Sequence, residues 1–256
     1  MLISARFNGP TGSANGGYAA GRFAQALLRA EPATVVGGRP VRVTLRRPPP
    51  LDTELRVVRS AEETLRVEAG ADPVTLIAEA EAVDGAIDGM TGPVDSSGGP
   101  VGGPTVPPVD LATAEAASAR YPGHDAHPFP DCYVCGPRHP DGLRVFPGPV
   151  GDGRSAAPFV VPDDRTVPTV WAALDCPGGW TVLAPGRPYL LGRMTATVAA
   201  LPAPGQRCVV VGELLETSGR KAEVRTTLYD AAGQPLAAAR ATWIAIAGPP
   251  PDDGAV

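Results

Sequence analysis

The residue best suited to catalysis is an acidic side chain inside an apolar segment. Asp175 follows Val170, Trp171 and Leu174, so a helix through these residues would carry one carboxylate on a mainly buried surface. An ionised carboxylate can act as a general base towards water, or it can attack a carbonyl carbon itself. The ordinary alternative is a structural carboxylate that is solvated or bonded to neighbouring backbone. The apolar neighbours argue against a fully exposed side chain, and Asp175 is the candidate catalytic residue.

Two further groups of polar residues could assist such a carboxylate. Asn15, Gly16 and Gly17 stand before an apolar segment, where the start of a helix offers hydrogen-bond donors. That segment contains no carboxylate, and Gln25 is its polar candidate. Thr197, with Thr195 as its neighbour, could orient an attacking water. We therefore predict Thr197 as a second catalytic residue and the other four as substrate-binding residues.

Two adjacent cations could bind an anionic part of a substrate. Arg220 and Lys221 follow Gly219 in what reads as a turn between strands. Arginine suits two-pronged contact with phosphate, and lysine suits a point-charge contact. Cations in turns are often simply solvated. We include both residues in the predicted substrate-binding set.

The histidines and cysteines limit the remaining chemistry. His124, His127 and His139 lie in one short window together with Cys132 and Cys135, and the sequence contains no Gly-x-Ser-x-Gly motif. A Ser-His-Asp or Cys-His hydrolase is therefore poorly supported. Thiolates and imidazoles in sets of four can hold zinc, but the prolines at 128, 130, 137 and 140 favour a packed loop. We expect no metal, with zinc as the alternative, and expect Cys176 to be buried filler because Pro177 follows it.

Composition and charge exclude several classes of partner. The chain has 256 residues and a formal net charge of -5, without a Lys/Arg run. These features give no basic surface for nucleic acid or anionic membrane. No apolar stretch approaches the roughly 18 residues that span a bilayer, and the N-terminal residues do not resemble an export signal. We predict a cytoplasmic protein with reduced thiols, without nucleic-acid or membrane partners.

The chain length allows two modules of roughly 120 residues each, and the spacing of apolar residues supports this division. In residues 1–84 we expect a strand over residues 2–7, a buried helix over 18–30 and an antiparallel set of strands. The expected strands cover residues 41–47, 54–59, 64–69 and 74–83. Residues 85–130 form a Gly/Pro-rich connector with a short helix over 111–120 that Asp110 can cap.

The second module, residues 131–247, follows a similar plan. A strand pair is expected over 143–146 and 156–161, then a helix from Pro168 that Pro177 should kink or interrupt. Strands follow over 190–200, 208–216, 222–229 and 235–246, and residues 248–256 read as a disordered tail. Gly16-Gly17-Tyr18 in the first module appears again as Gly178-Gly179-Trp180 in the second. We interpret this pair as a trace of internal duplication.

Several segments of the second module carry a family resemblance. The Cys132-Tyr-Val-Cys135-Gly segment with Gly142-Leu143 resembles the opening of thioesterases in the PaaI-like hotdog superfamily. Residues 170–175 are similar to that family's Val-Leu-Ala-Ala-Leu-Ala-Asp helix, and residues 219–243 to its last hairpin. The resemblance covers about residues 127 to 246. The first module resembles the family mainly through Asn15-Gly16-Gly17-Tyr18.

The resemblance implies a fold and a function. The fold would be α+β, with two tandem hotdog modules in which an antiparallel sheet wraps around a central helix. The function would be an acyl-CoA thioesterase in which Asp175 assists water, with coenzyme A as part of the substrate and no separate cofactor. In this family, basic residues near the last hairpin meet the phosphates of coenzyme A. This chain lacks the family's His-Gly-Gly at the helix start, where Val167-Pro168-Thr169 stands, so a mechanism that needs that histidine is not expected.

Two alternatives remain open at the level of sequence. The chain could be a non-catalytic protein that binds acyl thioesters, since fold does not fix function. It could also be a hydratase or dehydratase on the same scaffold, although these usually need a histidine beside the acid. The expected partner is a small acyl thioester in every case, and pairing of double-hotdog chains into a homo-oligomer is plausible.

Overall fold

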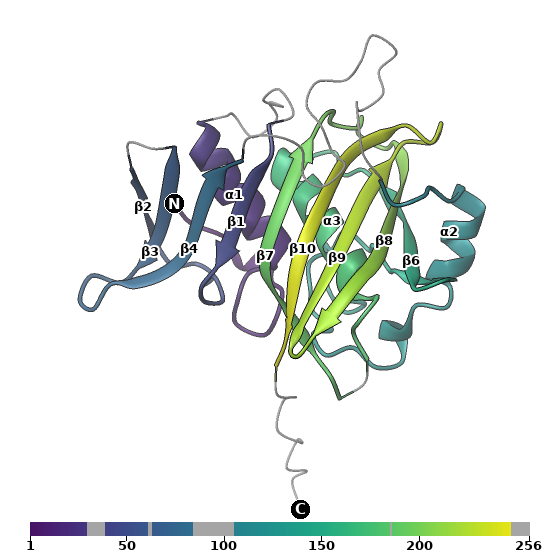
Figure 1. Ribbon diagram of the computed structural model, residues 1–256, viewed down its shortest axis with the longest axis horizontal. Helices are drawn as coiled ribbons and strands as arrows, with labels where there is room; N and C mark the ends of the chain where they lie inside the picture. The colour runs from purple at the N-terminus through teal and green to yellow at the C-terminus, as the bar shows by residue number, and fades with distance from the viewer. Residues whose placement is uncertain (30–38, 61–62, 84–104, 185, 247–256) are drawn as a thin grey trace, which may run out of the picture.

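One antiparallel sheet of ten strands forms the frame of the molecule (Figure 1). The computed structural model describes residues 1–29, 39–60, 63–83, 105–184 and 186–246. The strand order is β2-β3-β4-β1-β7-β10-β9-β8-β6-β5. The strands are β1 (Val41–Leu45), β2 (Leu55–Arg59), β3 (Thr64–Ala69), β4 (Thr75–Ala82), β5 (Gly148–Gly151), β6 (Arg154–Val160), β7 (Tyr189–Val198), β8 (Arg207–Ser218), β9 (Lys221–Tyr229) and β10 (Pro235–Ala245).

The strand order shows an internal duplication. Strands β1 and β7 pair antiparallel at the centre, with Val41 opposite Ala196. Moving outwards from this pair, β4, β3 and β2 on one side correspond to β10, β9 and β8 on the other. Each half contributes one long helix, α1 (Gly16–Leu28) or α3 (Val167–Gly179), and both helices lie on the same face of the sheet (Figure 1). The predicted α+β arrangement of two joined modules is confirmed.

Local sequence fixes the ends of both long helices. The side chain of Asn15 accepts a hydrogen bond from the amide of Tyr18 and caps the start of α1. The helix ends at Arg29, whose φ of 53° is in the left-handed region. Helix α3 begins with a capping box between Thr166 and Thr169, and Pro168 occupies its first turn. These caps define where each helix places its side chains.

The two long helices pack against each other at unusually close range. A Cβ atom on Gly17 would lie 2.5 Å from Cβ of Asp175 and 2.7 Å from the carbonyl oxygen of Trp171. A Cβ on Gly21 would lie 2.7 Å from Cα of Pro168. Only glycine fits at these two contacts. The absence of two side chains thus lets the first half of α1 lie directly against α3 between Pro168 and Asp175.

The main core fills the space between the helices and the sheet. Its largest fully buried side chains include Phe23, Tyr133, Phe159, Leu174 and Met194. Both halves contribute to this one core. Burying this much apolar surface is the dominant favourable contribution to folding.

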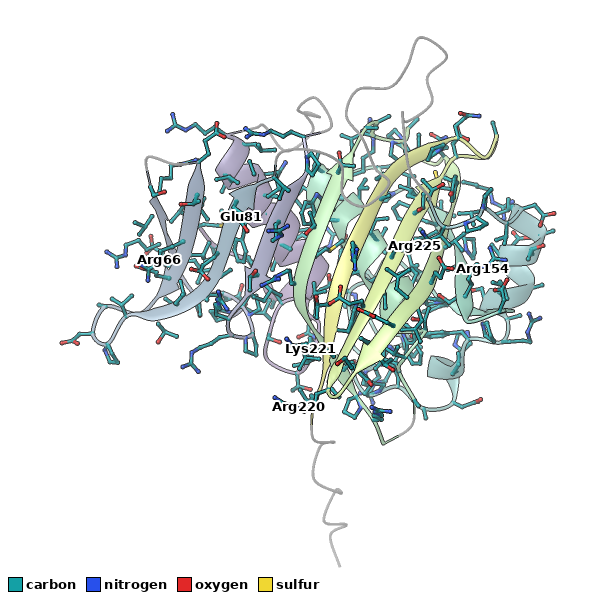
Figure 2. The ribbon with its side chains drawn as sticks, viewed as in Figure 1. Arg66, Glu81, Arg154, Arg220, Lys221 and Arg225 are labelled. Atoms are coloured by element: carbon teal, nitrogen blue, oxygen red, sulfur yellow. The ribbon has the colours of Figure 1, made fainter. Side chains whose placement is uncertain are left out.

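A smaller core lies on the other face of the sheet. Helix α2 (Leu111–Ser118), capped by Asp110, covers β6 and β8 there through Ala114 and Ala117, which pack with Ala156 and Val211. A short 3₁₀ helix, η2 (Pro122–His124), follows. Elsewhere this outer face carries charged rows, where Arg66, Glu81 and Arg225 are visible in front of the strands (Figure 2).

Several expected elements differ in the structure. Residues 2–7 do not form a strand: Ala5–Phe7 is a 3₁₀ helix, η1, because the Ser4 side chain caps it. Strand β6 pairs with β5 (Gly148–Gly151), not with residues 143–146, since the turn at Gly151-Asp152-Gly153 leads directly into that pairing. Helix α3 contains Pro177 and ends at Gly179, so it stops before Trp180 as expected.

The interpretation of the two Gly-Gly-aromatic segments as duplicated copies is wrong. Gly16 and Gly17 begin α1, whereas Gly178 and Gly179 end α3, so the two segments are not equivalent. The connector residues 85–104 and the tail residues 248–256 lie outside the described part of the chain. Within that described part, none of the helices is both long enough and apolar enough to cross a membrane.

Candidate active site

Asp175 is a buried carboxylate with one bonded and one unbonded oxygen. Its side chain is 3% exposed. Its Oδ2 atom accepts hydrogen bonds from the backbone amide of Gly17 at 2.9 Å and from Nδ2 of Asn15 at 3.1 Å. Its Oδ1 atom is buried and has no hydrogen-bond partner among the residues that the structure describes. One oxygen is therefore held in place by the start of α1, and the other has its lone pairs free.

This environment moves the acidity of Asp175 towards neutrality. Burial raises its pKa to about 7, and negative charge on Cys132 acts in the same direction. The hydrogen bonds from Gly17 and Asn15 oppose these effects by stabilising the ionised form. A carboxylate with a pKa near neutrality can both take up and release a proton under ordinary conditions.

An apolar cavity of about 210 Å³ reaches Asp175. Its wall combines both halves of the chain: Asn15 and Gly16 come from the start of α1, and Leu191 comes from β7. Other apolar lining residues are Leu45, Phe129, Trp180, Leu183 and Trp243. Since Asp175 lies in this wall, an apolar group in the cavity would be in reach of the carboxylate.

Three thiols and an imidazole gather beside the carboxylate. The sulfur atoms of Cys132, Cys135 and Cys176 all lie within 4.8 Å of one another, and the Cys132–Cys176 pair is 4.0 Å apart. Nε2 of His127 lies 3.3 Å from Sγ of Cys135. All four residues line the cavity with Asp175. Cys176 is therefore a member of a side-chain cluster and not isolated filler.

The three thiols differ in acidity. Hydrogen bonds from Cys135 and Cys176 lower the pKa of Cys132 well below its ordinary value, although burial acts against this. Burial raises the pKa of Cys135, and the hydrogen bond to Cys132 raises that of Cys176. The sulfur of Cys132 also accepts a hydrogen bond from Nδ2 of Asn15 at 3.7 Å.

The structure brings together four of the predicted site residues. Asn15 and Gly17 contact Asp175 directly, and Gly16 lines the same cavity. Gly16 is the first residue of α1, where a helix has no internal acceptor for its amide. These donors were predicted as substrate-binding groups, and in the structure two of them hold the carboxylate.

Two predicted residues are not brought to the cavity. Met194 and Ala196 of β7 face the core, so the alternate residues Thr195 and Thr197 point to the opposite face of the sheet. Thr197 therefore cannot orient a water at Asp175. Gln25 is buried on α1 but does not belong to the cavity wall.

The predicted cations lie near the cavity without lining it. Arg220 and Lys221 are at the turn between β8 and β9, at the lower end of the sheet in Figure 2. The carbonyl of Arg220 accepts the amide of Ala245, next to the lining residues Ile244 and Ile246. The arginines that do line the cavity are Arg46, which bonds to Glu79, and its neighbour Arg47.

The first half has no equivalent of this carboxylate. The helices α1 and α3 each have 13 residues, and their ninth residues are Ala24 and Asp175. The second residue of α1, Gly17, donates its amide to Asp175, whereas the second residue of α3 is Pro168, which has no amide hydrogen. The symmetry-related position thus lacks both the acid and its donor.

Sequence reasoning missed the cluster with Cys176 and the lining arginines. The Cys-x-x-Cys motif was visible, but Cys176 is 41 positions after Cys135, and only the fold brings them together. A pattern that could have suggested this is the pair of cysteines before a helix that carries a third cysteine beside its acid. Arg46 and Arg47 carried no signal that distinguishes them from other exposed arginines.

Comparison with known proteins supports the fold. No protein-family model matches the chain, and no curated protein matches it. Among solved structures it is similar to a protein of unknown function with hot dog fold from Alicyclobacillus acidocaldarius, with a TM-score of 0.53 and 15% identity over 96% of this chain and 91% of that chain.

Two further similar structures have described activities. One is an acyl-CoA thioesterase II from Mycobacterium marinum, with a TM-score of 0.52 and 15% identity over 91% of this chain and 89% of that chain. The other is the dehydratase domain of PpsC from Mycobacterium tuberculosis in complex with C12:1-CoA, with a TM-score of 0.52 and 17% identity over 91% and 85% of the two chains. With two helices against one duplicated sheet and likenesses that cover nearly the whole chain, this protein has the double-hotdog fold.

Proposed function

We propose that the chain hydrolyses acyl thioesters, with the acyl group in the apolar cavity and Asp175 as general base. The observation that carries this proposal is the unbonded, buried Oδ1 of Asp175 in the cavity wall. An ionised carboxylate there takes a proton from water while the water oxygen bonds to the acyl carbon. The C–S bond then breaks, and the proton passes to the leaving sulfur, which gives a carboxylic acid and a thiol.

The start of α1 would support the same step. The amide of Gly17 and Nδ2 of Asn15 hold one oxygen of Asp175, so the other oxygen keeps a fixed direction. The amide of Gly16, also in the cavity wall, is a suitable donor for the oxyanion that develops on the acyl carbonyl. Arg46 and Arg47 at the cavity, with Arg220 and Lys221 nearby, are candidate contacts for the phosphates of a coenzyme A carrier.

A hydratase or dehydratase is the second candidate, because one observation favours it. His127 lies in the same cavity wall as Asp175, and hydratases on this scaffold usually need a histidine beside the acid. However, Nδ1 of His127 accepts the amide of Phe129 at 2.8 Å, and Nε2 faces the sulfur of Cys135. Both ring nitrogens are engaged within the protein, which favours hydrolysis over addition of water across a double bond.

A panel of saturated and 2,3-unsaturated acyl-CoA esters tests the proposal. Thiol release is measured together with loss of the conjugated double bond, for wild type, Asp175→Asn and Thr197→Ala. We expect thiol release that falls by about 100-fold or more in Asp175→Asn and stays unchanged in Thr197→Ala, because Thr197 is on the outer face. Loss of the double bond without thiol release would support the hydratase instead. Binding of the esters without either reaction would identify a non-catalytic binding protein.

A further inference from the structure

We infer that Cys132, Cys135 and Cys176 form a zinc site in the wall of the cavity, with His127 as a hydrogen-bond donor to the site. The ligands come from two distant parts of the chain, the loop before β5 and helix α3. This inference does not depend on the proposed thioesterase activity. It replaces the expectation from sequence that the protein has no metal site.

The spacing of the sulfurs fits a tetrahedral ion. Zinc–sulfur bonds of about 2.3 Å at tetrahedral angles place sulfur atoms about 3.8 Å apart. The Sγ atoms of Cys132 and Cys176 are 4.0 Å apart, and all three sulfurs are within 4.8 Å of one another. Soft thiolate ligands select zinc over magnesium or calcium. Small side-chain movements would be sufficient to bring the sulfurs to bonding distance.

The loop that carries Cys132 and Cys135 forms a tight turn that holds these two residues close together. The amide of Gly136 bonds to the carbonyl of Cys132 at 2.8 Å and closes a tight turn. A Cβ atom on Gly136 would lie 2.3 Å from the backbone nitrogen of Cys132, so only glycine permits the turn. Hydrogen bonds from the side chains of Cys135 and Cys176, and from the backbone amides of Cys135 and Val134, lower the pKa of the Cys132 thiol. Amides directed at a sulfur stabilise its thiolate, the form that binds metal.

The hydrogen bonds of His127 give it a supporting position: it donates to a metal ligand and does not bind the ion itself. Its Nδ1 accepts the amide hydrogen of Phe129, so in the neutral ring Nε2 carries the proton. Nε2 lies 3.3 Å from Sγ of Cys135, so its proton can be donated to that sulfur. His127 therefore contacts a ligand and is not itself one. The fourth position on the ion is left to solvent from the cavity, which the three cysteines line.

Metal content and cobalt spectroscopy test the site. The full chain, free of any affinity tag, is purified in reducing buffer as wild type, Cys132→Ser, Cys135→Ser, Cys176→Ser and Cys208→Ser. Cys208 is the matched control, because it is buried on β8 and lies outside the cluster. We expect about one zinc per chain in wild type and Cys208→Ser, and less than a tenth of that in each cluster variant.

Titration of metal-free protein with Co(II) identifies the ligands. We expect thiolate-to-cobalt charge-transfer bands in wild type and Cys208→Ser and their loss in the cluster variants. His127→Ala should keep the bands but bind the ion about 10- to 100-fold more weakly, as for loss of a hydrogen bond to a ligand. Complete loss of the bands in folded His127→Ala would contradict the supporting position.

Protection of thiols provides a readout if a cluster variant fails to fold. Zinc added to metal-free wild type should shield three of the four thiols from a thiol reagent and raise the unfolding temperature, while Cys208→Ser retains both effects. The inference is overturned if wild type takes up neither zinc nor cobalt, if cluster variants keep as much metal as the control, or if two of the cysteines form a disulfide instead. Absence of thioesterase activity has no bearing on these measurements.

Discussion

The raised pKa of Asp175 predicts a specific dependence of folding stability on pH. In the folded chain this pKa is about 7, whereas an aspartate in an unfolded chain has a pKa of about 3.9. The folded state thus binds the proton more tightly. Asp175 has no net effect below about pH 4, where both states are protonated. It lowers the free energy of unfolding progressively from pH 4 to pH 7, and the loss is complete above about pH 7.

The size of the effect follows from the two pKa values. The complete loss is on the order of 4 kcal/mol, and the part that develops between pH 5 and pH 8 is about 2.6 kcal/mol. Asp175→Asn removes the titration and keeps a similar shape. Between pH 5 and pH 8, the free energy of unfolding of Asp175→Asn should therefore rise by about 2.6 kcal/mol relative to that of wild type.

Urea unfolding at pH 5 and pH 8 measures this difference. The experiment uses metal-free protein with a chelator present, because a cation on the neighbouring thiols would lower the pKa of the carboxyl group. Thr197→Ala, on the outer face of the sheet, removes no titratable group; it is the control and should show a constant difference from wild type. The reasoning is refuted if the Asp175→Asn difference stays constant with pH or changes in the opposite direction.

Three further predictions concern the contacts of the carboxylate and the mouth of the cavity. Asn15→Ala removes a donor that stabilises ionised Asp175, so the lower limb of the pH–rate profile should move to higher pH; an unmoved limb would show that this bond does not tune the acid. Gly17→Ala forces a side chain into the contact between the helices and should lower the free energy of unfolding by about 1–3 kcal/mol in urea; an unchanged midpoint at equal slope would contradict the close packing. Arg47→Ala should raise KM for acyl-CoA about fivefold with kcat unchanged, which corresponds to about 1 kcal/mol for one phosphate contact. Because Arg47 lines the cavity, this increase in KM should exceed that of Arg220→Ala. A larger increase in Arg220→Ala would instead place the coenzyme A carrier at the β8–β9 turn.

The second half of the fold was readable from the sequence because its signals are local. The Thr166–Thr169 capping box, Pro168 and the following apolar residues specify a helix without reference to the rest of the chain. The same locality made Asp175 stand out as an acid among apolar neighbours. The first helix was predicted from the spacing of its apolar residues over 18–30, whereas its cap, Asn15, was assigned only as a substrate-binding donor.

The errors about the site and the duplication concern relations between distant segments. The side of the sheet that Thr197 faces depends on the register of β7 with β1 and β10, which a single strand does not reveal. The contact of Cys176 with Cys132 depends on how the loop that carries Cys132 packs against α3. The matching Gly-Gly-aromatic segments were similar in letters but lie at opposite ends of their helices.

Ala24 and Pro168 hold the helix positions that correspond to Asp175 and Gly17, and this difference between the halves has a consequence for how such a site can evolve. In a symmetric homodimer every substitution occurs at both sites, so a change that damages one site damages the other. In a single chain with two halves, one helix can lose its acid and its donor while the other keeps both. The half without the acid then contributes only to the wall of the cavity. A titration of a non-hydrolysable acyl thioester should accordingly saturate at one ligand per chain.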